Sequence, residues 1–67
     1  MMKLMINGQE KTLQEGMTVA ALLLQYELLE ERIAVEVNGV IVDRQAFSST
    51  VLGEASVVEI VRFVGGG

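Results

Sequence analysis

The chain has 67 residues, enough for one domain, and lies near the size at which a core buries only about 60% of the unfolded surface. It contains no cysteine and no histidine, which excludes disulfide cross-links, zinc-finger spacing and a Cys or His nucleophile. Nine acidic and five basic residues give a net charge of −4, which argues against nucleic acid as the partner.

The first predicted element is a strand over residues 2–7. Leu4 and Ile6 alternate with Lys3 and Met5, as the two faces of a half-buried strand do. The dipeptide Asn7-Gly8 then predicts a tight hairpin, because both residues tolerate the positive φ of a type I′ turn. We therefore expect a second strand over about residues 10–13, antiparallel to the first.

A helix is predicted over residues 19–26. The hydroxyl of Thr18 can cap its first turn. One apolar stripe, at spacing i, i+3, i+4 and i+7, comprises Val19, Leu22, Leu23 and Tyr26. The acidic residues that follow (Glu27, Glu30 and Glu31) are interpreted as a solvated loop or helix end, because three exposed glutamates without a Gly-rich loop make a poor metal site.

The second half of the chain predicts three more strands. Residues 33–38 alternate, with Val35 and Val37 inward and Ala34 and Glu36 outward. Asn38-Gly39 repeats the hairpin signal, so residues 40–42 return as a fourth strand. Residues 43–47 form one helical turn that places Phe47 at the end of the core, and residues 57–64 form the fifth and longest strand.

This order of elements predicts an α+β domain over residues 1–64, with one helix packed on one face of a mixed five-stranded sheet. The first and last strands are strongly apolar, so we expect them side by side at the centre of the sheet. The longest apolar run, residues 19–24, is far short of the ~20 residues of a membrane helix. The apolar residues near the amino terminus stop at Asn7-Gly8, too early for a signal peptide. We expect a cytoplasmic protein.

The sequence ends with three glycines, Gly65, Gly66 and Gly67, directly after the fifth predicted strand. Glycine adopts backbone angles closed to other residues, so such a tail can thread a narrow channel. We expect a flexible tail that reaches about 10 Å beyond the strand. The α-carboxylate of Gly67 would be a good substrate for an enzyme that makes acyl-adenylates. A flexible linker with no such role is the simpler interpretation of the tail alone.

Two stretches resemble the sulfur carrier protein of thiamine biosynthesis, the ThiS family, namely residues 33–42 (IAVEVNGVIV) and residues 58–67 (VEIVRFVGGG). The resemblance covers essentially the whole chain and implies the ubiquitin-like β-grasp fold. One departure is Ala55-Ser56, where the family usually has Gly-Asp before the last strand. Ser56 can still form a side-chain-to-backbone turn bond.

The resemblance also implies a chemistry. A ubiquitin-activating-like adenylating enzyme uses ATP and Mg²⁺ to convert the Gly67 carboxylate into an acyl-adenylate. Sulfur from a cysteine-desulfurase relay displaces AMP and leaves a thiocarboxylate, which thiazole synthase consumes. The carrier binds no cofactor or metal of its own and is a substrate of its partners, not an enzyme.

Strand alternation predicts where partners dock. If Val58 and Ile60 face the helix, the residues between them face away. An apolar patch leading to the tail would then lie on the open face of the sheet and comprise Met5, Ala34, Val61 and Phe63. Glu36 and Glu59 would frame this patch and favour a basic partner surface, which aids encounter more than affinity.

Three other functions remain open on the sequence. The chain could carry sulfur for molybdopterin or for tRNA thiolation, because those carriers share the glycine tail. It could be a β-grasp interaction module in which the glycines are incidental. It could also be a ubiquitin-like modifier, whose tail would be joined to a lysine of another protein.

Overall fold

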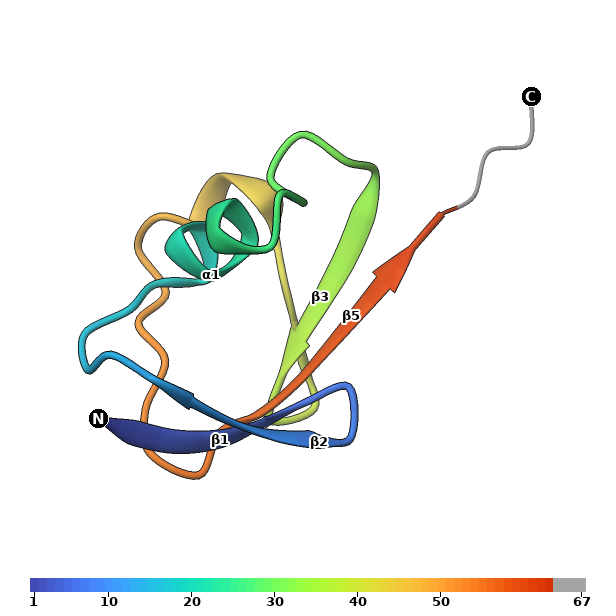
Figure 1. Ribbon diagram of the computed structural model, residues 1–67. Coiled ribbons are helices and arrows are strands. Elements are labelled where there is room, and N and C mark those ends of the chain that lie inside the picture. The colour runs from blue at the N-terminus through green and yellow to red at the C-terminus, as the bar shows by residue number, and fades with distance from the viewer. Residues whose placement is uncertain (64–67) are drawn as a thin grey trace.

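Two β-hairpins, one α-helix between them and a final strand make up the structure, a computed structural model that describes residues 1–63 (Figure 1). In chain order the elements are β1 (Met2–Ile6), β2 (Gln9–Leu13), α1 (Val19–Gln25), β3 (Ile33–Val37), β4 (Val40–Val42), the 3-10 turn η1 (Arg44–Ala46) and β5 (Val57–Arg62). Every predicted element is present, with boundaries shifted by one or two residues where they can be compared. Val64 and the glycine tail (65–67) lie outside the described residues.

The strands form one mixed sheet in the order β2-β1-β5-β3-β4. β5 is parallel to β1, with Met5 opposite Val57, and antiparallel to β3, with Ala34 opposite Val61. The predicted adjacency of the first and last strands is therefore confirmed. Because β5 runs between the two hairpins, it joins the halves of the sheet into a single surface.

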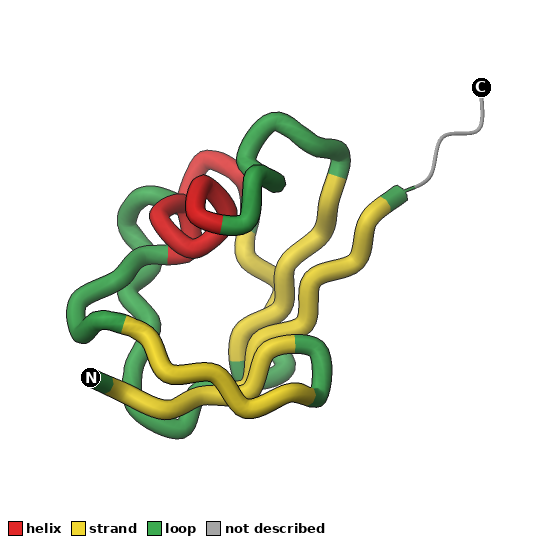
Figure 2. The backbone as a smooth tube through the Cα atoms, in the orientation of Figure 1, coloured by secondary structure: helices red, strands yellow, loops and turns green. Residues whose placement is uncertain are grey.

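The core lies between the sheet and α1, which crosses one face of the sheet (Figure 2). The Thr18 Oγ1 accepts a hydrogen bond from the Ala21 N–H at 3.1 Å, so the predicted cap begins the helix. Fully buried side chains come from both layers and from the loops; they include Leu4, Leu22, Leu23, Leu52, Val35 and Val58. Phe47 closes one end of this core, as predicted, whereas Val37 is only partly buried.

The asparagine of each Asn-Gly hairpin also forms hydrogen bonds to β5. Asn7 and Asn38 have φ of 51° and 52°, the positive values that the type I′ turn requires. The Asn7 Oδ1 accepts a hydrogen bond from the Ile60 N–H at 2.7 Å, and the Asn38 Oδ1 accepts one from the Val57 N–H at 2.8 Å. Their own N–H groups donate to the carbonyls of Val58 and Val57. Two local turns therefore hold the central strand from both sides.

The helices within residues 1–63 are all too short or too polar to cross a membrane.

Candidate functional site: the open face of the sheet

The face of the sheet away from α1 carries every residue that the sequence predicts for docking. The register places Ala34 opposite Val61 and Glu36 opposite Glu59 across the β3–β5 pair. Met5 lies on the neighbouring strand β1, and Phe63 directly follows β5. Val61 and Phe63 are more than half exposed, at 53% and 59%. Exposed apolar side chains that lie together on one face are typical of interaction surfaces.

Two further apolar residues belong to this open face and were not predicted. Val57 lies beside Met5 in the β1–β5 pair, and Ile41 lies opposite Glu36 in the β3–β4 pair. Both are substantially exposed, Ile41 at 67%. Alternation along β4 and β5 assigns both residues to the outer face, and this alternation was the sequence signal that could have found them. The patch therefore extends over four of the five strands.

The prediction that Glu36 and Glu59 frame the apolar patch is wrong. The register places them across its centre, between the Ala34–Val61 pair and the Met5–Val57 pair. They are exposed and directly opposite on adjacent antiparallel strands. Like charges directly opposite each other on neighbouring strands destabilise a sheet. Neither carboxylate forms an ion pair within residues 1–63. A cationic group of a partner lying over both carboxylates would relieve the repulsion.

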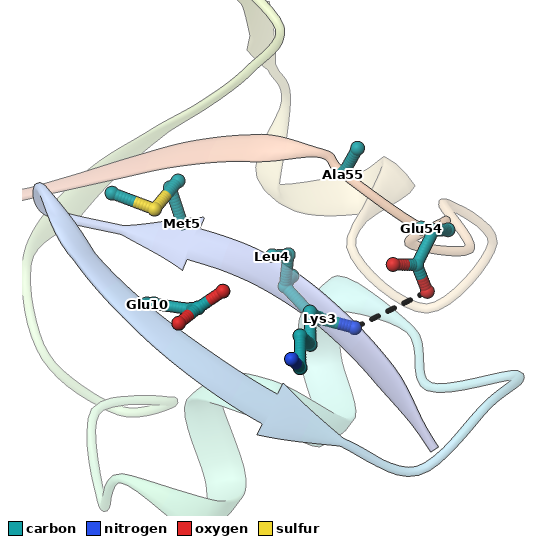
Figure 3. Close-up of a pocket in the computed structure, with 6 residues that line it drawn as sticks. All are labelled: Lys3, Leu4, Met5, Glu10, Glu54 and Ala55. Carbon is teal, nitrogen blue, oxygen red and sulfur yellow. Dashed lines mark hydrogen bonds between the residues drawn. The ribbon is translucent and has the colours of Figure 1, made fainter.

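A shallow groove marks the end of the open face near the start of β1, away from Phe63. Its volume is about 300 Å³, and its lining comprises Lys3, Leu4, Met5, Glu10, Glu54 and Ala55 (Figure 3). Small-molecule pockets are usually ≈300–1,000 Å³ and bury most of the ligand. An open groove at the lower limit of that range fits a protruding side chain of a protein better than a small molecule.

The wall of this groove is the turn before β5. The Ala55 N–H donates to the Lys3 carbonyl at 2.8 Å, and the Lys3 N–H donates to the Glu54 Oε1 at 3.2 Å (Figure 3). The Glu54 carboxylate thus accepts a hydrogen bond from the β1 backbone at Lys3, a position on β1 that β5 does not reach. The buried Ser56 accepts a hydrogen bond from the Gly53 N–H at 3.1 Å through its Oγ, which confirms the turn bond expected at this departure from the family pattern.

The described residues thus include the predicted docking patch, and the predicted sulfur-attachment site at Gly67, with Gly65 and Gly66, lies outside them. Within the described residues, a mixed five-stranded sheet in the order β2-β1-β5-β3-β4 with one α-helix across its inner face defines a ubiquitin-like β-grasp protein. The ThiS family profile matches residues 4–67, nearly the whole chain. This chain belongs to the ThiS family.

Relatives and solved structures agree with that assignment. The chain is 35% identical over 65 residues to the sulfur carrier protein ThiS of Bacillus subtilis, covering 96% of this chain and 98% of that protein. A crystal structure of the thiamine biosynthesis protein ThiS of Geobacter metallireducens superposes with a TM-score of 0.84 at 33% identity, over 98% of this chain and 100% of that one.

A second group of relatives is much longer. The chain is 39% identical over 66 residues to a thiazole synthase of Paramagnetospirillum magneticum and 36% identical to one of Magnetococcus marinus. The match covers 98% of this chain in both cases, but the chain spans only 20% of the length of either synthase.

Proposed function

We propose that this chain carries sulfur for thiamine biosynthesis on its C-terminal glycine. The observation that carries the proposal is the family match, which runs from Leu4 through Gly67 and so includes the glycine tail. The near-complete overlap with the sulfur carrier protein of Bacillus subtilis supports the same function.

The proposed chemistry takes place at the α-carboxylate of Gly67. A carboxylate oxygen attacks the α-phosphorus of ATP in an adenylating enzyme, and pyrophosphate leaves with Mg²⁺ bound by that enzyme. The terminal sulfur of a persulfide (R–S–SH) on a cysteine-desulfurase relay then attacks the acyl carbon, and AMP leaves to give an acyl disulfide. A thiol reductant cleaves the S–S bond of this intermediate and releases the thiocarboxylate. The carrier supplies no catalytic group to any of these steps.

The two parts of the molecule have separate roles in this proposal. The open face binds the partner, and the tail delivers the reacting carboxylate. Val61 and Phe63 are the apolar anchors, while Glu36 and Glu59 favour a partner surface that presents arginine or lysine. A docking surface on the same chain as the reacting carboxylate raises the rate, because binding of the surface brings the two reactants together.

The acceptor of the sulfur is proposed to be thiazole synthase. The likeness of this chain to a fifth of the length of two thiazole synthases supports a shared place in thiazole formation. The same open face would serve the adenylating enzyme and the synthase in turn, so the two partners would compete for one carrier.

Mass spectrometry of the C-terminal fragment tests the proposal directly. Replacement of one oxygen by sulfur adds about 16 Da to the fragment that contains Gly67, and the four methionines, whose oxidation adds the same nominal mass, lie upstream of that fragment. We expect the added mass after incubation with ATP, the cognate adenylating enzyme and a sulfur donor.

A deletion of Gly66 and Gly67 is the matched control. We expect it to abolish AMP-dependent activation while the melting temperature stays within about 1 °C of the wild type, because glycine has no side chain to pack. Activation that survives this deletion in a folded protein would overturn the carrier function.

A further inference from the structure

The connection between α1 and β3, residues 27–32, is a folded segment and not an open loop. Its first residue, Glu27, has a φ of 61°, which ends the helix. The Leu28 N–H donates to the Leu23 carbonyl at 2.7 Å, and the Glu31 N–H donates to the Leu28 carbonyl at 3.0 Å. Leu28 and Leu29 pack against the core. The segment therefore has a defined shape beside the end of β5.

Arg44 of η1 binds this segment through two backbone carbonyls. Its Nη1 donates to the Leu29 carbonyl at 2.9 Å, and its Nη2 donates to the Glu31 carbonyl at 2.7 Å. The guanidinium lies 5.4 Å from the ring centroid of Phe47, a core residue that is 3% exposed. A planar guanidinium can make both bonds at once while it stacks on a ring, and a lysine cannot.

The same segment holds the end of β5. The Glu31 Oε1 accepts a hydrogen bond from the Arg62 Nη2 at 3.1 Å, and the Arg32 carbonyl accepts one from the Phe63 N–H at 2.9 Å. Arg62 is the last residue of β5, and Phe63 is the last described residue before the glycines. A continuous set of contacts, which we call the strut, thus runs from Phe47 through Arg44 and Glu31 to Arg62.

We infer that Arg44 is a positioning residue for activation of the C-terminal glycine, because the strut fixes the point from which residues 64–67 begin. This inference rests on the proposed function. None of the strut side chains belongs to the docking patch, and of that patch the segment holds only the backbone of Phe63, so the strut acts on delivery of the tail more than on binding of the enzyme. A displacement of 1 Å in a reacting group can cost about 100-fold in rate.

The exposed ion pair between Glu31 and Arg62 contributes little alone, because both side chains are about half exposed or more, at 46% and 63%. The two charge-assisted bonds of Arg44 to backbone carbonyls are the stronger component. Loss of Arg44 should therefore lower kcat more than loss of the Glu31 charge does. The order of the two effects tests the inference.

The experiment measures adenylation kinetics by pyrophosphate release from the cognate adenylating enzyme, with the full chain as the varied substrate. We expect Arg44→Met to lower kcat about tenfold and to change KM much less, since part of the orientation is lost while Val61, the anchor within β5, stays in place. Glu31→Gln should lower kcat less. Lys11→Met is the matched control for the lost positive charge; Lys11 lies on β2, opposite Leu4, and should leave both constants unchanged.

Amide hydrogen exchange tests, in the absence of the enzyme, whether the strut holds the end of β5 in place. We expect Arg44→Met to speed exchange at the Phe63 N–H and to leave the Ile60 N–H, in the middle of β5, unchanged. An unchanged kcat for a folded Arg44→Met variant would overturn the inference, as would a raised KM with an unchanged kcat. If Arg44→Met does not fold, the kcat of Glu31→Gln decides the question by the same criteria. If the wild type is not adenylated at all, the proposed function fails, whereas the exchange result still decides whether the strut exists.

Discussion

Ala55 holds a backbone conformation that residues other than glycine avoid. Its φ is +67°, within the left-handed region, where Cβ crowds the following carbonyl at roughly 1–2 kcal/mol. The strain is sustained because the Ala55 N–H donates to the Lys3 carbonyl and the buried Ser56 side chain closes the turn. The family's usual glycine at this turn would adopt the same angle without that cost.

The substitution Ala55→Gly should therefore stabilise the protein. The relieved strain exceeds the ~0.5–1 kcal/mol that glycine loses through its more flexible unfolded chain, so we expect a net gain of about 0.5–1 kcal/mol. Thermal unfolding would detect it as a rise in Tm of several degrees, at ~4–8 °C per kcal/mol for a domain of this size. Ala34→Gly, in β3 at an ordinary φ, is the control and should lower Tm. A fall in Tm for both variants would show that Ala55 is not strained.

At the scale of secondary-structure elements, the two hairpin turns act on a strand that neither of them contains. Asn7 and Asn38 each accept a hydrogen bond from a β5 N–H through the side chain and donate one to a β5 carbonyl through the backbone. The environments differ: the bond to Ile60 is partly buried and the bond to Val57 is exposed. If the side chain is removed, water can replace the Asn38 Oδ1 at the exposed Val57 N–H, but it cannot replace the Asn7 Oδ1 at the partly buried Ile60 N–H.

Removal of the Asn7 side chain should consequently destabilise the fold more than removal of Asn38. Asn7→Gly keeps the positive φ of the turn but leaves a partly buried N–H without its acceptor, at about 1–3 kcal/mol. Asn38→Gly should cost less than half as much. Asn7→Asp, which retains an acceptor oxygen and tolerates the same φ, is the control and should recover most of the loss. Urea unfolding midpoints measure all three, and equal losses for the two glycine variants would contradict the difference in burial.

The elements that the sequence predicts correctly are those set by local rules. The alternation of residues 2–7, the Asn-Gly turns and the stripe of α1 all depend on neighbours within a few positions. The adjacency of β1 and β5 follows from their apolar character. The hydrogen bond between Asn7 and Ile60 joins residues 53 positions apart, and no local pattern indicates it. Arg44 likewise looks like an ordinary surface arginine until the carbonyls of Leu29 and Glu31 are placed around it.

The whole molecule presents two unlike sides, and only one of them is proposed to bind partners. We expect Val61→Asp to weaken binding to the adenylating enzyme by at least ~2 kcal/mol, because interface energy concentrates in a few apolar anchors. Leu24→Asp is the matched control: Leu24 is 66% exposed but lies on α1, on the other side of the sheet. Calorimetric titration of both variants, after circular dichroism has shown native folding, measures the difference. Similar affinities for the two would remove the open face from the mechanism.

The central position of β5 also governs when the protein can fold during its synthesis. About 53 residues must be added after Asn7 before Ile60 exists to pair with it, which takes roughly 3–10 s at ~5–20 residues per second. Until then β1 and β2 have no third strand beside them, and an isolated two-stranded hairpin is marginally stable in water. Val57 and Val61, which complete the open face, are made in the same final interval. A chain that ends before residue 57 lacks β5 entirely and therefore cannot assemble the open face.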